Sequence, residues 1–146
     1  LTATENDYDK VKKTGKYRSI NRKSWDYKQL KERLTDEDHH AHKIFAELKR
    51  LIHIRTQQPA FHPDAGQDIP DLGNALFAIK TSHDSVDTIW CISNITDKIQ
   101  NLDLSDLILP NKELMDLITN KSYKVNQTIN LKPYQTVWLI KSYRIR

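Results

Sequence analysis

The feature that most constrains the fold is a run of amphipathic sequence from Thr35 to Gln58. Its apolar residues recur three and four positions apart, which is the spacing of one face of an α-helix. They are Ala41, Ile44, Phe45, Leu48, Leu51 and Ile52. Thr35 or Asp36 suits the N-terminal cap, and Pro59 ends the helix because the residue before a proline avoids helical backbone angles. The sequence therefore predicts a helix of roughly 30 Å at ~1.5 Å per residue, whose apolar face needs a cover.

The sequence before this helix is basic, in a chain of formal net charge +4. We expect residues 1 to 23 to form a loop with one helical turn near residues 7 to 13. Ser24 is then predicted to cap a short helix that ends near Leu34. A basic segment can attract phosphate groups, whether free, on sugars or in nucleic acid. The basic residues are Lys10, Lys12, Lys13, Lys16, Arg18, Arg22 and Lys23.

The sequence after Pro63 consists of short apolar runs separated by turn residues. Such spacing is typical of an antiparallel sheet or a small sandwich. Strands are expected at residues 74–81, 87–95, 98–102, 114–118, 122–125, 128–131 and 136–142. The predicted class is therefore α+β, with a loop-and-helix half over residues 1–60 and an all-β half over residues 67–146.

Cysteine content and hydropathy indicate the cellular compartment. The single cysteine, Cys91, excludes a disulfide framework within the chain and favours a reducing compartment. The chain has no apolar run of about 18 residues, so we expect no membrane span, and no apolar stretch suits a secretion signal. These features favour a cytoplasmic protein.

Three stretches of the chain resemble a known enzyme family. They are residues 5–8 followed by Lys13-Thr14-Gly15-Lys16-Tyr17-Arg18-Ser19-Ile20-Asn21-Arg22, residues 51–63, and Leu131-Lys132-Pro133-Tyr134-Gln135-Thr136-Val137-Trp138-Leu139. In this order they resemble the C-terminal part of sucrose phosphorylase-like enzymes of the α-amylase superfamily, glycoside hydrolase family 13. The variant is most similar to members that act on phosphorylated or glycerate-linked glucosides.

The resemblance implies a fold and indicates which part of it carries the catalytic residues. In this family a (β/α)8 barrel carries the chemistry of retaining glucosyl transfer and a small β domain follows it. Residues 1–60 would be the loop after the last barrel strand and the final helices. Retaining transfer needs two carboxyl groups about 5–5.5 Å apart, and the family's catalytic acids lie upstream of this region. We therefore expect a non-catalytic tail that needs no cofactor, with sugar and phosphate as partners through the parent enzyme.

Four residues are candidates for substrate binding. Arg22 and Arg18 match the arginines of the family string, which is expected to hold sugar hydroxyls or an adjoining carboxylate, and a planar guanidinium suits that role. Asn6 and Asp7 match the start of the same loop and could shape the acceptor side of the pocket. The competing interpretation is a solvated basic loop for the arginines and a local Asx turn for Asn6 and Asp7.

Other suggestive residues are better explained by structure. His39 and His42 stand one helical turn apart, but the sequence supplies no second ligand pair in a recognised spacing, so no metal site is predicted. Trp25, Trp90 and Trp138 could form a sugar platform; Trp90 and Trp138 lie in strand-like runs, which favours core packing. Cys91 lacks a basic context, so a buried inert thiol is expected.

Two other functional classes compete with the enzyme tail. The basic segment with its tyrosines could form a small binding module for nucleic acid or carbohydrate, although the acidic β half argues against nucleic acid. Alternatively the chain is a structural interaction domain. In that case the apolar face of the long helix packs on the β half or on a second copy of the chain.

Overall fold

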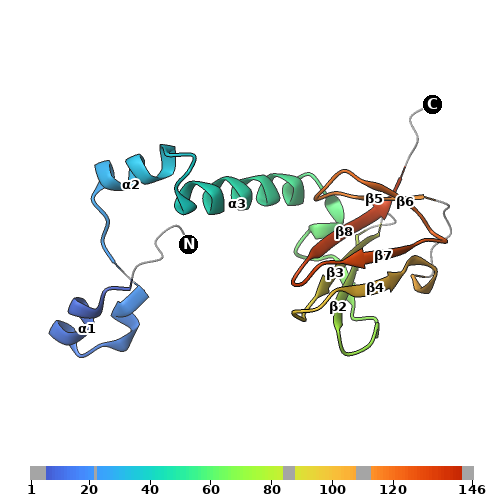
Figure 1. Ribbon diagram of the computed structural model, residues 1–146, viewed down its shortest axis with the longest axis horizontal. Helices are drawn as coiled ribbons and strands as arrows, with labels where there is room; N and C mark the ends of the chain where they lie inside the picture. Colours follow the sequence, from blue (N-terminus) through green and yellow to red (C-terminus); the bar gives the residue numbers. More distant parts are fainter. Residues whose placement is uncertain (1–5, 22, 84–87, 108–112, 143–146) are drawn as a thin grey trace. The chain divides into compact units, whose positions relative to one another are not determined.

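The computed structural model describes residues 6–21, 23–83, 88–107 and 113–142. The chain divides into two compact units, Leu1–His53 and Ile54–Arg146, and each is described by itself. The first unit contains short helices and most of one long helix, which can be followed in blue to green in Figure 1. They are α1 (Tyr8–Thr14), η1 (Tyr17–Asn21), α2 (Tyr27–Thr35) and α3 (His40–Thr56). No helix among the described residues is long and apolar enough to cross a membrane.

The helix ends differ from those predicted, and local capping explains the difference. Asp26, rather than Ser24, caps α2 through a bond from the backbone N–H of Gln29 (3.1 Å). The long helix begins at His40, because Asp36 ends α2 and His39 Nδ1 accepts the backbone N–H of Ala41 (3.1 Å). Its 17 residues make α3 about 26 Å long at ~1.5 Å per residue, shorter than the sequence predicted.

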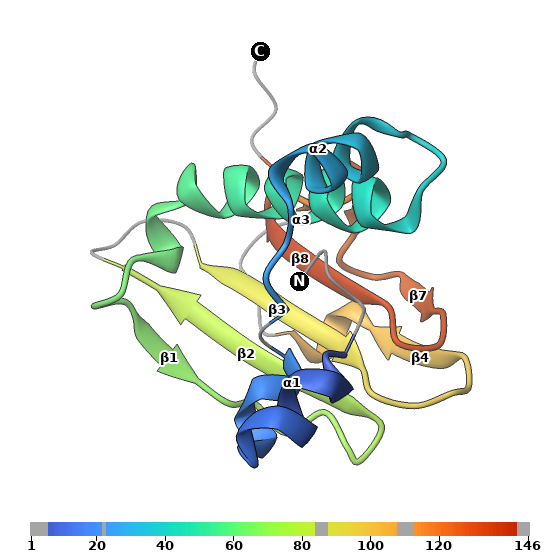
Figure 2. The same ribbon diagram turned by 90° about the vertical axis from the view of Figure 1, so that its left-hand side faces the viewer.

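The second unit is built on a six-stranded sheet, and Figure 2 shows four of its strands, β1, β2, β3 and β8, side by side. Its strand order is β1-β2-β3-β8-β5-β6, and each pairing is antiparallel. The strands are β1 (Gly66–Asp68), β2 (Leu76–Ser82), β3 (Ile89–Asn94), β5 (Glu113–Asp116), β6 (Ser122–Lys124) and β8 (Thr136–Lys141). A second sheet pairs β4 (Gln100–Asp103) with β7 (Thr128–Leu131). The predicted α+β class is confirmed.

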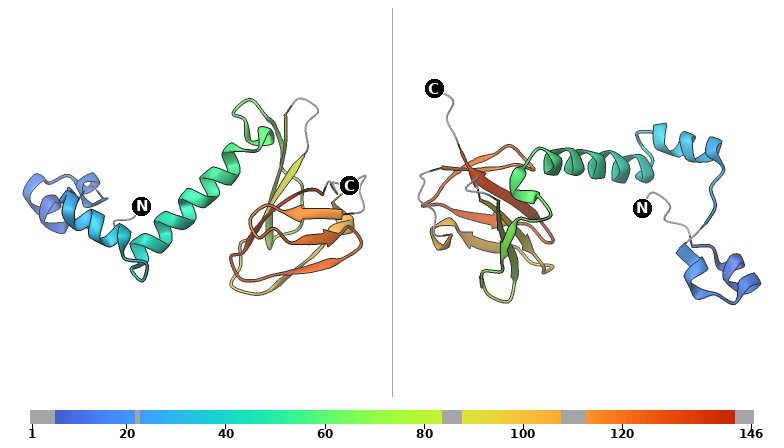
Figure 3. Two further views of the ribbon diagram at one scale, coloured as in Figure 1. Left: turned by 90° about the horizontal axis from the view of Figure 1, so that it is seen from above. Right: turned by 180° about the vertical axis from the view of Figure 1, so that it is seen from behind.

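The main core lies between the two sheets, which form the layers of a sandwich (Figure 3). Alternate residues of each strand face inward, as the two-residue period of a strand requires. From the large sheet these include Ile92, Val137 and Leu139, each fully buried, and from the small sheet Leu102 and Leu131. The short helix η3 (Leu104–Asp106) adds Leu104 to the same cluster. Burial of this kind stabilises a domain by ~25 cal/mol per Å² of apolar surface.

The opposite face of the large sheet is apolar too and is only partly covered. Its middle row runs across three strands as Ile79, Cys91 and Trp138, which are direct partners in register. The cover is η2 (Pro59–Phe61), a single 3-10 turn that begins at the proline that follows the long helix. The hydroxyl of Thr81 on β2 donates to the carbonyl of Ala60 (2.6 Å) and fixes η2 to the sheet.

Several features of the β half were absent from the sequence-based expectation. The edge strand β1 and the 3-10 turns η2 and η3 were missed because each is only three residues long. Residues 84–87, between the strands predicted at 74–81 and 87–95, lie outside the described residues. Tyr134 adopts a positive φ of 57° in the turn before β8, a conformation uncommon for a bulky residue.

Candidate functional site

The segment that carries the candidate binding residues forms a closed unit rather than an open loop. The backbone N–H of Asp7 donates to the carbonyl of Ile20 (2.8 Å), so the start of α1 lies beside the end of η1. Between the helices Gly15 takes a left-handed φ of 64°, which a residue without a side chain adopts at little cost. The hydroxyl of Thr14 donates to the carbonyl of Lys10 (2.7 Å) and lies 3.2 Å from the hydroxyl of Ser19. These bonds give the basic segment a defined shape.

The structure places three of the four candidate residues on this unit. Asp7 caps α1, because its Oδ1 accepts the backbone N–H of Lys10 (2.9 Å); a local role of this kind was the competing interpretation. Asn6 Nδ2 donates to the hydroxyl of Tyr8 (3.3 Å), and both side chains are exposed. Arg18 lies exposed on η1, and Arg22 lies outside the described residues. A substrate-binding role for these four residues stays a prediction.

The charge of this unit is carried on exposed side chains. Lys12, Lys13, Lys16 and Arg18 are all exposed, within seven consecutive residues. Tyr17 is 85% exposed between the last two of them. Lys12 and Lys13 also lie in the last turn of α1, where positive charge interacts favourably with the helix dipole. The unit therefore presents an exposed positive surface, to which negatively charged groups are attracted.

The tryptophans take structural positions. Trp90 is 6% exposed in the main core, and the ring of Trp138 packs on that of Phe61 with centroids 5.0 Å apart. Core packing is thus confirmed for both. Two cations contact the ring of Trp25, with Lys23 Nζ 4.8 Å and Arg33 Cζ 4.5 Å from the ring centroid. Because Arg33 belongs to α2, its contact holds Trp25, in the segment after η1, against that helix.

The histidines at the start of α3 make contacts within the first unit. His42 Nδ1 lies 2.7 Å from the carbonyl oxygen of Leu34 and connects α3 with α2. The His39 ring stacks on that of His40 with centroids 4.3 Å apart. In the described part of the chain no three His, Cys, Asp or Glu side chains are placed to hold a metal ion.

The thiol of Cys91 is half-buried on the partly covered face of the sheet. Burial raises its pKa to about 11, although the nearby charge of Arg55 acts in the opposite direction. Because the thiolate is the nucleophilic form, the thiol is poorly suited to nucleophilic catalysis at neutral pH.

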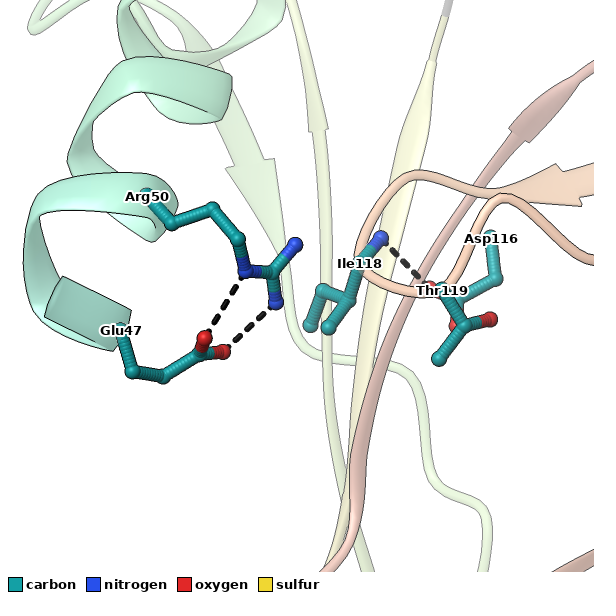
Figure 4. A network of polar contacts seen from close by, with 5 residues as sticks. All are labelled: Glu47, Arg50, Asp116, Ile118 and Thr119. Carbon is teal, nitrogen blue, oxygen red and sulfur yellow. Dashed lines mark hydrogen bonds and ion pairs between the residues drawn. The ribbon is translucent and has the colours of Figure 1, made fainter. Parts of the chain in front are cut away.

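One carboxylate, that of Asp116 on β5, is fully buried, and sequence reasoning did not single it out. Its Oδ1 accepts the backbone N–H groups of Ile118 (3.1 Å) and Trp138 (2.9 Å), and its Oδ2 accepts the hydroxyl of Thr119 (2.6 Å). Figure 4 shows the Asp116–Ile118 bond, and separately the ion pair of Glu47 with Arg50 on α3 (2.6 Å). With two donors from the turn that follows β5 and one from β8, the Asp116 carboxylate has a structural role.

A second buried polar residue, Asn94 at the end of β3, was also missed. Its Nδ2 donates to the carbonyls of Lys98, Leu131 and Lys132, at 2.7, 3.2 and 2.8 Å. Its Oδ1 accepts the backbone N–H (2.9 Å) and the hydroxyl (2.8 Å) of Thr96. Because Leu131 belongs to β7, this amide links the two sheets. The only signal in the sequence is a polar residue that ends an apolar strand-like run.

Comparison with known proteins agrees with this architecture. The chain is 30% identical over 139 residues to the glucosylglycerate phosphorylase of Escherichia coli, a match that covers 95% of this chain and 24% of that enzyme. It is 31% identical over 140 residues to the glucosylglycerate phosphorylase of Allomeiothermus silvanus, covering 96% of this chain and 23% of that enzyme. The chain resembles a sucrose phosphorylase-like enzyme of glycoside hydrolase family 13. The resemblance drawn from the three sequence stretches is thereby confirmed.

Solved structures give the same fold assignment. The α-amylase of Geobacillus thermoleovorans, solved with acarbose, matches with a TM-score of 0.64 at 15% identity, over 85% of this chain and 26% of that one. AmyP, solved with maltose, matches with a TM-score of 0.60 at 17% identity, over 68% of this chain and 20% of that one. At this identity the likeness concerns the fold alone. No family model matches the chain.

The chain spans about a quarter of the length of the curated phosphorylases that it matches. The match is therefore uneven between this chain and its relatives. It covers nearly all of this chain but leaves about three quarters of each relative without a counterpart.

Proposed function

We propose that this chain acts as the C-terminal portion of a glucoside phosphorylase of the sucrose phosphorylase type, which transfers an α-glucosyl group to phosphate with retention. Residues 1–60 belong to its catalytic barrel and residues 67–146 form the β domain that follows. The chain itself supplies a substrate-binding loop and scaffold and does not catalyse the reaction. The observation that carries the proposal is the match over 95% of this chain to only 24% of the E. coli glucosylglycerate phosphorylase.

The surface of α3 supports this proposal. Ile44, Phe45 and Ile52 are 40%, 43% and 51% exposed, although they belong to the predicted apolar face of the helix. A monomeric protein seldom leaves a contiguous apolar stripe open to water. In the proposed enzyme the rest of the barrel covers this stripe, and in the isolated chain the same stripe favours self-association.

The closed α1–η1 unit supports the assignment of a substrate-binding loop. It presents Asn6 and Arg18 as exposed donors on a segment whose backbone is fixed by several hydrogen bonds. Both glucosylglycerate and phosphate carry negative charge, which suits an exposed positive surface. We propose that Arg18 and Arg22 bind the substrate, with Asn6 and Asp7 at the acceptor side.

Substitution of Arg18 tests the proposal in the full-length protein that contains this chain. Arg18→Ala is expected to lower kcat/KM for phosphorolysis by about 10- to 100-fold, because a hydrogen bond from a charged group contributes ~1.5–3 kcal/mol. Lys12→Ala is the matched control, since Lys12 is also an exposed basic residue, on the neighbouring helix α1. Equal rates for both variants and the parent would remove Arg18 from the binding site.

A further inference from the structure

The turn between α3 and η2 borders an open hollow on the surface of the second unit. Its volume is about 410 Å³, within the range of ~300–1,000 Å³ that is typical of small-molecule sites. The hollow lies entirely within the second unit. It is lined by Arg55, Thr56, Gln57, Gln58, Pro59, Phe61, His62 and Pro63.

The walls of this hollow are held in place by the sheet. The Phe61 ring packs against Trp138 of β8, and η2 is fastened to β2 through Thr81. Arg55 lies over the same Phe61 ring, with its Cζ 5.3 Å from the centroid. A guanidinium that stacks on an aromatic face keeps its N–H edge free to donate. The donor of the hollow is therefore oriented before any ligand arrives.

Three polar side chains of the lining, those of Arg55, Gln57 and Gln58, are available to a ligand. Among the described residues no carboxylate pairs with Arg55, and the side-chain amides of Gln57 and Gln58 make no hydrogen bond. The lining contains no Asp or Glu. A guanidinium edge matches a carboxylate or phosphate with two parallel hydrogen bonds. A primary amide both donates and accepts, which suits a hydroxyl group.

We propose that this hollow binds a small hydroxylated carboxylate of the sugar-acid class. The carboxylate pairs with Arg55, the hydroxyl groups bond the amides of Gln57 and Gln58, and the C–H surface of the ligand lies against Pro59 and Pro63. The ligand must present both an anion and hydroxyl groups, because the lining offers one cation and two neutral amides. Binding here requires only residues of this chain.

Titration of the ¹⁵N-labelled chain with D-glycerate, at constant ionic strength, tests the proposal. Backbone amide signals of residues 55–63 are expected to shift and saturate in the millimolar range, together with the Arg55 Nε–H signal. Acetate and glucose each supply half of the recognised chemistry, so each is expected to bind at least about 5-fold more weakly. Inorganic phosphate, an anion without a carbon-bound hydroxyl, is likewise expected to compete poorly.

Two arginine variants on the same helix give the matched comparison. Arg55→Ala is expected to weaken D-glycerate binding by about 10-fold or more, because the charged bidentate contact is lost. Arg50→Ala removes an exposed arginine that already pairs with Glu47 (2.6 Å), and it is expected to leave binding unchanged. Unchanged binding by Arg55→Ala would overturn the proposal. So would shifts confined to the basic residues 10–23, or phosphate binding as tight as that of D-glycerate.

Discussion

Replacement of Asn94 with alanine is expected to destabilise the β half by about 3–5 kcal/mol, since each buried polar group left without a partner costs ~1–3 kcal/mol. The variant leaves the carbonyls of Lys98, Leu131 and Lys132 without their shared donor. It also leaves the backbone N–H of Thr96 without its acceptor. Urea unfolding followed by tryptophan fluorescence measures the change in the free energy of unfolding.

Asn101→Ala is the matched control for Asn94→Ala. Asn101 lies exposed on β4, in the sheet that Asn94 joins to β3, and its side chain makes no described hydrogen bond. A surface substitution of this kind changes stability by less than ~0.5 kcal/mol. If Asn94→Ala does not fold, Thr96→Val removes a hydroxyl that donates to Asn94 Oδ1 (2.8 Å) and accepts from Gln100 Nε2 (3.0 Å). This variant is expected to lower the free energy of unfolding by ~1–2 kcal/mol. Equal stability of the Asn94 and Asn101 variants would contradict the proposed link between the sheets.

Asp116→Ala is expected to lower the free energy of unfolding by about 3–4 kcal/mol. Each hydrogen bond to a charged group contributes ~1.5–3 kcal/mol. Removal of the buried charge recovers only part of this loss, because burying a charge is itself unfavourable. The variant deprives the backbone N–H groups of Ile118 and Trp138 of their acceptor in a site that excludes water. Asp116→Asn keeps one oxygen acceptor and the shape of the side chain, so its cost is expected to be about 1–2 kcal/mol. Thermal and urea unfolding of the two variants give the ranking.

A spectroscopic readout distinguishes loss of charge from loss of packing at Asp116. Burial raises the pKa of Tyr123 above its ordinary value, and the negative charge of Asp116 raises it further. Neutralising that charge in Asp116→Asn is therefore expected to lower the pKa of Tyr123, measured by ultraviolet absorbance of the phenolate. An unchanged Tyr123 titration, or equal stability of Asp116→Asn and Asp116→Ala, would contradict the described role of the carboxylate.

The elements that the sequence predicts well are those whose pattern is long. The period of α3 extends over several turns and predicts both its existence and its apolar stripe. Its start was placed too early because Thr35 and Asp36 are good capping residues, yet they finish α2 instead. The strands β2, β3 and β8 were located within two residues, since their alternation follows the two faces of the sheet.

The polar residues that organise the β half could not be predicted in the same way. Asn94 and Asp116 act through partners 37 and 22 positions away, Leu131 and Trp138. Contacts of this range follow from strand order, which periodicity does not specify. The hollow at Arg55 likewise depends on a 3-10 turn and on the aromatic neighbour that holds the arginine in place. Asn6, Asp7 and Arg18 were named through a family resemblance, because their local sequence has no period.

Assay of the purified chain for release of glucose 1-phosphate, with glucosylglycerate or sucrose plus inorganic phosphate, tests the central claim most directly. The E. coli glucosylglycerate phosphorylase serves as the positive control with glucosylglycerate. Because retaining transfer needs a pair of catalytic carboxyl groups that the proposal places outside this chain, we predict no release above the enzyme-free blank. Sustained release of glucose 1-phosphate by the chain alone would contradict the account.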